Sequence, residues 1–130
     1  MVIDNITTEK HLQVYVKETC RLIQVFGLKH REFYFNHADI ECDDPGARVL
    51  ACFEYGDDCA SWVRFTLGKK WGTQKITTAS LKATALHEVY HFLLSEYNAL
   101  CRDRFVTESQ IMQEEHRIIS RLMNITFGKI

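Results

Sequence analysis

Hydrophobic residues in the first quarter of the chain recur at the spacing of one helical face. The positions that share this face, one threonine among them, are Leu12, Tyr15, Val16, Thr19, Leu22, Ile23 and Phe26. Gly27 follows directly, and glycine often ends a helix because it adopts the left-handed conformation at low cost. We therefore predict a helix from about residue 8 to residue 26.

The pattern then changes to the shorter alternation that is typical of strands. The three segments with this character are residues 32–36, 48–55 and 59–67. In the last of them, Val63 and Phe65 alternate with Trp62 and Arg64, as expected of a strand with one buried face. The turn Gly56-Asp57-Asp58 joins the second and third segments. We predict three strands, of which the last two form a hairpin.

Two longer helical patterns complete the chain. One runs from about residue 78 to residue 100, with Thr77, Thr78 or Ser80 as candidate caps. The other opens on residues 107–110, whose Thr-Glu-Ser-Gln sequence has the capping-box pattern, and runs to about Met123. This order indicates an α+β fold, with helices packed on a small three-stranded antiparallel sheet. No repeat or linker is visible, so residues 1–130 are predicted to form a single domain.

Composition narrows the classes of function. The chain has 130 residues and a net charge of -1, with 46% hydrophobic and 25% charged residues, as in globular proteins. Because basic residues are neither in excess nor clustered, we expect no nucleic-acid or membrane partner. The chain shows neither an apolar run of membrane-spanning length nor a signal-peptide core, so the expected location is the cytoplasm. Its five cysteines lack CxxC spacing and are expected to be reduced thiols.

Residues 87–91, with the sequence His-Glu-Val-Tyr-His, carry the clearest chemical signal. They lie within a predicted helix, so His87 and His91 project side by side from one face. Two imidazoles held in this way can occupy two corners of a tetrahedral Zn²⁺ site. Glu88 lies between them, where a carboxylate can take a proton from water. The motif predicts a catalytic zinc site.

A catalytic zinc usually has a third protein ligand from another segment. The last helix offers Glu108, Glu114, Glu115 and His116. Its apolar face is defined by Ile111, Ile118, Ile119 and Leu122. At about 100° per residue, Glu115 falls in the middle of this stripe, whereas Glu114 and His116 lie to either side. A carboxylate among apolar neighbours is costly unless it is paired or binds a metal. Glu115 is therefore the predicted third ligand; an ion pair with Arg102 or Arg121 is its alternative role.

The motif and its surroundings, over about residues 62–122, resemble the zincin metallopeptidases of the gluzincin type. The compact order of elements is similar to small bacterial and phage-encoded metalloproteases of the ImmA-like and SprT-like kind, which implies the cytoplasm of a host cell for a phage protein. The resemblance implies a zinc-dependent peptidase in which Glu88 is the general base and a protein or peptide is the substrate. Candidate transition-state stabilisers are Tyr90, Tyr97 and His116. The strand before the motif, with Trp62 and Arg64, is expected to form the edge that accepts substrate.

Two other classes of function remain open. Peptide deformylases also carry HExxH, with an upstream cysteine as third ligand, and Cys42 or Cys52 is a candidate for that role. Those enzymes have glycine-rich segments before the motif, which this chain lacks. The other class is a zincin-like scaffold without catalysis, used as a binding module, for instance as an accessory or anti-defence factor of a phage.

Overall fold

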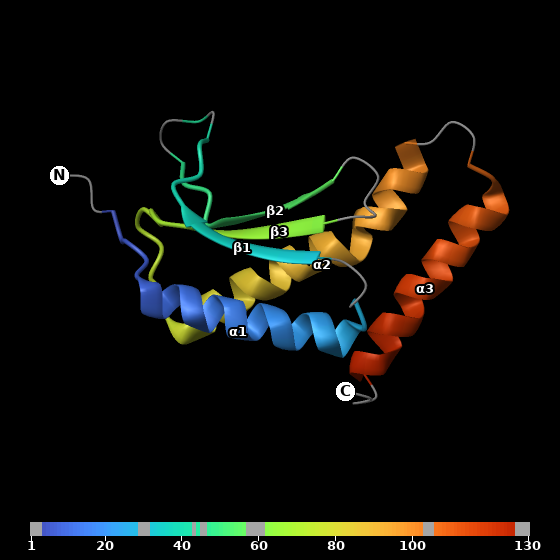
Figure 1. Cartoon of the computed structure of the whole chain (residues 1–130), viewed down its shortest axis with the longest axis horizontal. Coiled ribbons are helices and arrows are strands. Elements are labelled where there is room, and N and C mark those ends of the chain that lie inside the picture. Colours follow the sequence, from blue (N-terminus) through green and yellow to red (C-terminus); the bar gives the residue numbers. More distant parts are fainter. Residues whose placement is uncertain are drawn as a thin grey trace.

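The computed structural model describes residues 4–28, 32–42, 44, 47–56, 62–102 and 106–126, without the side chains of residues 96, 102, 124 and 126. Within them, the elements are α1 (Glu9–Phe26), β1 (Glu32–Ala38), β2 (Ala51–Tyr55), β3 (Trp62–Gly68), α2 (Thr78–Arg102) and α3 (Glu108–Thr126). The predicted order of helices and strands is confirmed, and the fold is of the α+β class (Figure 1). None of the helices in these ranges is long and apolar enough to cross a membrane.

The sheet is mixed, not antiparallel as predicted. Its strand order is β1-β3-β2, with β1 parallel and β2 antiparallel to the central β3. The antiparallel β2–β3 pair agrees with the predicted hairpin, although residues 57–61 of its turn lie outside the described residues. β1 and β2 are therefore not neighbours in the sheet. β3, which follows both in the chain, lies between them. β2 is consequently an edge strand.

One face of the sheet is covered by α1 and α2, which run side by side (Figure 1). Phe92 of α2 anchors this packing through ring contacts with Phe33, Phe53 and Phe65, one from each strand. The opposite face of the sheet is more open, since Tyr34 of β1 is exposed. The helices form one layer and the sheet the other, and α2 lies against the edge strand β2.

Helix α1 begins and ends at residues that satisfy its backbone groups. The backbone N–H of Thr8 donates to Nδ1 of His11 over 2.9 Å, and the N–H of His11 donates in return to Oγ1 of Thr8. At the other end, Gly27 adopts a left-handed conformation with φ of 72°. The predicted helix over residues 8–26 is confirmed.

The other two helices open on reciprocal caps of the same kind. At the start of α2, the N–H of Thr77 donates to Oγ of Ser80 over 2.8 Å, and the N–H of Ser80 donates to Oγ1 of Thr77 over 3.0 Å. At the start of α3, Thr107 and Gln110 exchange bonds of 2.8 and 3.2 Å. The capping box predicted at residues 107–110 is thus confirmed.

Helix α3 turns a different face toward the protein from the one predicted. Glu114 is buried and Glu115 exposed, while Ile119 and Leu122 of the expected apolar face are 45% and 41% exposed. Glu114 tolerates burial because Arg117, one turn later, donates from Nε to its carboxylate over 2.7 Å. The predicted position of Glu115 within a buried stripe is therefore wrong.

Candidate metal centre

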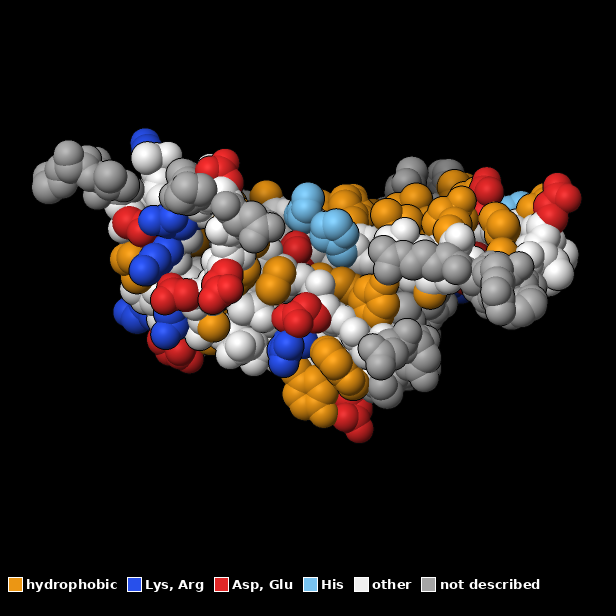
Figure 2. Space-filling view, turned by 90° about the horizontal axis from the view of Figure 1, so that it is seen from above, with side chains coloured by type: hydrophobic (Ala, Val, Ile, Leu, Met, Phe, Trp, Pro, Cys, Tyr) orange, Lys and Arg blue, Asp and Glu red, His pale blue; other side chains and the backbone are white. Residues whose placement is uncertain are grey.

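The two histidines of the HExxH motif lie on the solvent-exposed side of α2. Ala85 and Val89 are completely buried and anchor this part of the helix in the core. His87 and His91 are one helical turn apart, so their rings project from the same side, where both are exposed. Figure 2 shows histidine side chains lying open on the molecular surface. The prediction that the two imidazoles share one face of a helix is confirmed.

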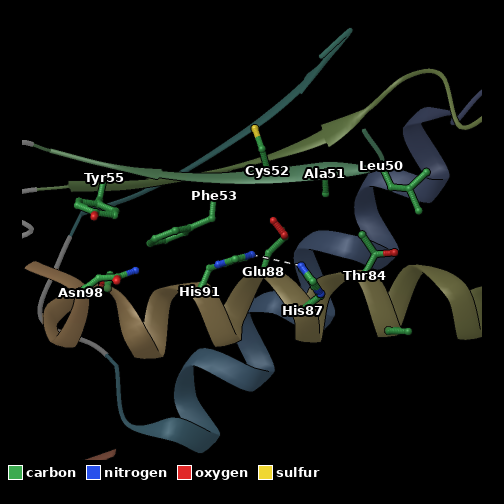
Figure 3. Close-up of a pocket in the computed structure, with 12 residues that line it drawn as sticks. Leu50, Ala51, Cys52, Phe53, Tyr55, Thr84, His87, Glu88, His91 and Asn98 are labelled. Atoms are coloured by element: carbon green, nitrogen blue, oxygen red, sulfur yellow. Dashed lines mark hydrogen bonds between the residues drawn. The ribbon is translucent and has the colours of Figure 1, made fainter. Parts of the chain in front are cut away.

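A cleft of about 640 Å³ lies between α2 and the β2 side of the sheet. It is lined by Leu50, Ala51, Cys52, Phe53, Tyr55, Ala83, Thr84, His87, Glu88, His91, Ser95 and Asn98. Figure 3 shows His87, Glu88 and His91 directed from the helix into this space. The volume falls within the range of roughly 300–1,000 Å³ that is typical of ligand-binding clefts. The motif therefore stands at a place that a ligand can occupy.

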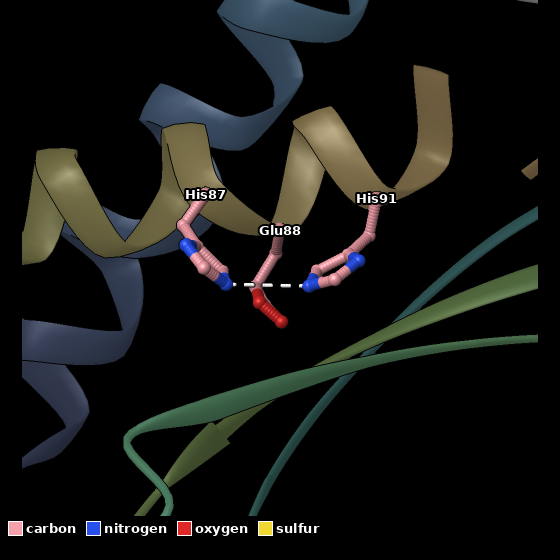
Figure 4. Close-up of side chains that lie close together, drawn as sticks. All are labelled: His87, Glu88 and His91. Carbon is pink, nitrogen blue, oxygen red and sulfur yellow. Dashed lines mark hydrogen bonds between the residues drawn. The ribbon is translucent and has the colours of Figure 1, made fainter. Parts of the chain in front are cut away.

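His87, Glu88 and His91 form a compact group of potential metal ligands (Figure 4), whose ligand atoms lie within 4.8 Å of one another. Nε2 of His87 and Nε2 of His91 are 3.2 Å apart. Two nitrogens bound to one tetrahedral Zn²⁺ at about 2.0–2.1 Å lie roughly 3.3 Å from each other. The two imidazoles thus already have the spacing that a shared metal ion requires, and the donor set fits Zn²⁺.

Glu88 has a different environment from its two neighbours. Its side chain is only 4% exposed, although the histidines on either side are open to solvent. Burial raises the pKa of Glu88, while the positive charges that His91 and His87 can carry act in the opposite direction. A carboxylate whose pKa is raised toward neutrality is suited to accept a proton and later release it.

Glu115, the predicted third ligand, lies outside this group of three side chains. The pKa of Tyr97 on α2 is raised chiefly by Cys101 and in smaller part by the negative charge of Glu115. Glu108 and His116 are exposed on α3 and also lie outside the group. Arg102 is one of the two arginines predicted as alternative ion-pair partners of Glu115, and its side chain lies outside the described residues.

The predicted transition-state stabilisers are absent from the lining of the cleft. Tyr90 packs edge-to-face against Phe26 of α1, with ring centroids 5.9 Å apart. Tyr97 and His116 also do not line the cleft, which instead contains the polar side chains of Tyr55 and Asn98. Two signals in the sequence point to this pair. Tyr55 shares the alternation of Phe53 in β2, and Asn98 follows His91 by two helical turns.

The predicted substrate edge is wrong for Trp62 and Arg64. Both belong to β3, which pairs with a strand on each side and has no free edge. Arg64 instead pairs with Glu54 over 2.8 Å and stacks on Trp62 at 5.5 Å. The strand that borders the cleft is β2, because β3 occupies the centre of the sheet.

Cys52 reaches the cleft but not the metal group. Figure 3 shows its sulfur directed away from His87 and His91, and its thiol is instead 3.9 Å from the carboxylate of Glu54. Burial raises the pKa of this thiol, which disfavours the thiolate that a metal ligand requires. Cys42, the other cysteine considered as a ligand, is also outside the group. Both are free thiols, as are Cys20 and Cys101.

Comparisons with known proteins add no family to this description. No protein-family model, curated protein or solved structure matches the chain. The resemblance to zincins consequently rests on the HExxH motif and the order of elements alone.

Proposed function

We propose that this protein is a zinc-dependent peptide-bond hydrolase of a compact HExxH type. The observation that carries the proposal is the 3.2 Å spacing of the two imidazole nitrogens beside a buried carboxylate, in an open cleft. A bound Zn²⁺ supplies a Lewis acid that lowers the pKa of water and polarises a substrate carbonyl. The side chains of the chain itself must then hold the metal, move a proton and position the substrate.

His87 and His91 would hold the metal through their Nε2 atoms. For the third ligand we propose Glu115, because it is exposed and its charge acts on Tyr97 of α2, whereas Glu114 is engaged by Arg117. Ligation by Glu115 requires its carboxylate to move from this position to the histidines. The metal thus connects α2 to α3 in the proposed active form.

Glu88 would act as the general base. Its carboxylate accepts a proton as water attacks the peptide carbonyl, and it delivers that proton to the leaving amine. Burial supports this role, since the raised pKa of Glu88 brings its protonated and ionised forms closer in free energy. Of the other polar side chains in the cleft, Thr84 and Ser95 donate to carbonyls of their own helix, so Tyr55 and Asn98 are the candidates to bind substrate.

The free edge of β2 would bind the substrate as an added strand. Gly68 N–H donates to the carbonyl of Leu50, and Gly56 N–H donates to the carbonyl of Trp62. In an antiparallel pair these bonded positions alternate, so Ala51, Phe53 and Tyr55 direct their backbone N–H and C=O groups away from β3. Those groups are available to an extended peptide beside the metal site.

The test is a comparison of wild type with Glu88→Gln, both loaded with one equivalent of Zn²⁺ and incubated with a bacterial lysate. New protein N-termini are then counted by mass spectrometry. We expect wild type to generate them and Glu88→Gln, which keeps the size of the side chain, to generate none. Equal sets of new N-termini from the two proteins would contradict hydrolysis by this site.

The alternative function is a binding module that does not cleave its partner. The exposed apolar side chains on α2 and α3 favour it, because such surfaces often bind proteins. The same substitution separates the two functions. A cellular effect that persists in Glu88→Gln supports binding alone, whereas an effect that disappears while the zinc content is retained supports catalysis.

A further inference from the structure

Two polar side chains lie on opposite walls of the cleft, at the end beyond His91 (Figure 3). They are Tyr55, from the strand β2, and Asn98, from the helix α2. Among the described residues, neither the hydroxyl of Tyr55 nor the side-chain amide of Asn98 has a hydrogen-bond partner. This end of the cleft therefore presents hydrogen-bonding groups that the described part of the fold does not use.

Strand alternation and helical phase place these two side chains independently of each other. Phe53 stacks on Phe92 of α2, and Tyr55 follows Phe53 by two positions, so the same face of β2 turns Tyr55 toward the helix. The rings of Phe53 and Tyr55 lie 5.8 Å apart. Asn98 follows His91 by about two helical turns, so it lies on the side of α2 that carries the histidines. Both polar groups thus belong to the same space as the metal group.

The opposite end of the cleft, beyond His87, has a different chemistry. Leu50 and Ala83 contribute only apolar side chains there. The hydroxyl of Thr84 donates to the carbonyl of Ser80, one turn earlier on α2, over 2.8 Å. The described lining is consequently apolar on one side of the metal group and carries unused hydrogen-bonding groups on the other.

Charge narrows the kind of side chain that the polar end can bind. No Lys, Arg or Asp belongs to the described lining, and its only carboxylate is Glu88, between the two histidines. A charged substrate side chain at Tyr55 and Asn98 would lose hydration without meeting an opposite charge. A neutral amide is better matched. It carries an acceptor and an NH2 donor in one plane, as Asn98 does, so the two amides can exchange a pair of hydrogen bonds.

The position of these side chains determines which residue of an extended substrate they meet. At about 1.5 Å of rise per residue, Asn98 lies roughly 10 Å along α2 from His91. An extended chain covers this distance with about three residues. A substrate strand on the edge of β2 would therefore bring a side chain to Tyr55 and Asn98 at about three residues from the bond held at the metal group.

We propose that Tyr55 and Asn98 form an amide subsite, which selects a Gln or Asn side chain of the polypeptide substrate about three residues from the scissile bond. The assignment rests on the proposed function and specifies the class of substrate. Glu and Asp have the shape of the amides but lack the NH2 donor and carry a charge. Leu and Met have a similar size but form no hydrogen bonds.

The test is a cleavage profile. Zinc-loaded wild type and Glu88→Gln are incubated with a peptide library prepared from a bacterial proteome, and the cleaved bonds are identified by mass spectrometry. At one position, two to four residues from the bond, we expect wild type to favour Gln or Asn at least about fivefold over Glu, Asp, Leu and Met. The reason is that only an amide completes the hydrogen bonds of the subsite.

Two variants examine the subsite itself. Asn98→Leu keeps the approximate shape of the side chain and removes its hydrogen-bonding groups, so we expect the preference for Gln and Asn to be replaced by one for Leu and Met. Tyr55→Phe removes only a hydroxyl and should reduce the amide preference about twofold. Asn36→Leu is the matched control, because Asn36 is an exposed asparagine on β1, outside the lining of the cleft, and it should keep the wild-type profile.

The possible outcomes separate the subsite from the proposed function. A wild type that cleaves without an amide preference at these positions overturns the subsite alone, as does an Asn98→Leu variant that retains the preference. If Asn98→Leu cleaves nothing, Tyr55→Phe decides, and an unchanged preference in that variant overturns the subsite. Identical products from wild type and Glu88→Gln show instead that hydrolysis by this site has failed, and the subsite falls with it.

Discussion

At the scale of single residues, the site combines two solvent-exposed imidazoles with a buried carboxylate from the same helical turn. Exposure leaves the ring nitrogens of His87 and His91 open to a metal ion from the solvent. Burial gives Glu88 the opposite property, because its ionised form is disfavoured. The sequence predicted that His87, Glu88 and His91 lie together, but the difference in burial depends on how α2 lies under β2.

Burial of Glu88 has a consequence for the metal-free protein. Its pKa is raised above the ordinary 4.5, so the folded chain binds this proton more tightly than the unfolded chain. The ionised carboxylate is therefore destabilising at higher pH, and Glu88→Gln removes that effect. We expect the stability advantage of Glu88→Gln, measured by urea unfolding in EDTA, to be absent below about pH 4.5 and to increase toward pH 7. An advantage that does not change with pH would contradict this account.

The neighbouring carboxylates of α3 allow a matched comparison of the third ligand. Glu115→Gln preserves volume and removes charge, so we expect the affinity for Zn²⁺ to fall at least about tenfold. Glu114→Gln should leave this affinity nearly unchanged but lower the free energy of unfolding by about 1–3 kcal/mol, because the charge-assisted bond between Glu114 and Arg117 is lost. Metal competition and urea unfolding measure the two quantities. The opposite ranking of zinc affinities would show that Glu115 is not the ligand.

At the scale of elements, sequence periodicity located the helices because apolar spacing and capping residues are local signals. It did not predict that β1 pairs in parallel with β3, since alternation within a strand does not specify its neighbour. It also misplaced the buried face of α3. Hydrophobicity alone does not show that Arg117 compensates the charge of Glu114, whose burial turns Ile119 outward.

The edge position of β2 can be tested with proline, which lacks a backbone N–H. Ala51→Pro removes a donor directed away from β3, whereas Cys52→Pro removes one that belongs to the β2–β3 pairing. We expect Cys52→Pro to be less stable than Ala51→Pro by about 1–3 kcal/mol in thermal unfolding. Ala51→Pro should instead lose most of its cleavage of lysate proteins while it retains zinc. Full cleavage by a folded Ala51→Pro would argue against strand addition at this edge.

At the scale of the whole molecule, a two-layer fold places the metal group beside an edge strand. α1 and α2 cover one face of the sheet, and the strand order leaves β2 free beside the histidines. The motif predicted the metal group, but the cleft walls, with Tyr55 and Asn98, arise from tertiary packing. The cleft is lined by residues from both β2 and α2, and the exposed face of α3 depends on how that helix packs, so neither feature can be predicted from one segment of the sequence.

Zinc stoichiometry tests the central claim most directly. Gently purified wild type, His91→Ala and His116→Ala are each equilibrated with Zn²⁺, desalted and analysed for metal by mass spectrometry. His116 is the control, because it is an exposed histidine outside the metal group. We expect about one equivalent of zinc per chain in wild type and His116→Ala, and almost none in His91→Ala. Equal zinc in wild type and His91→Ala would contradict a metal centre at the HExxH motif.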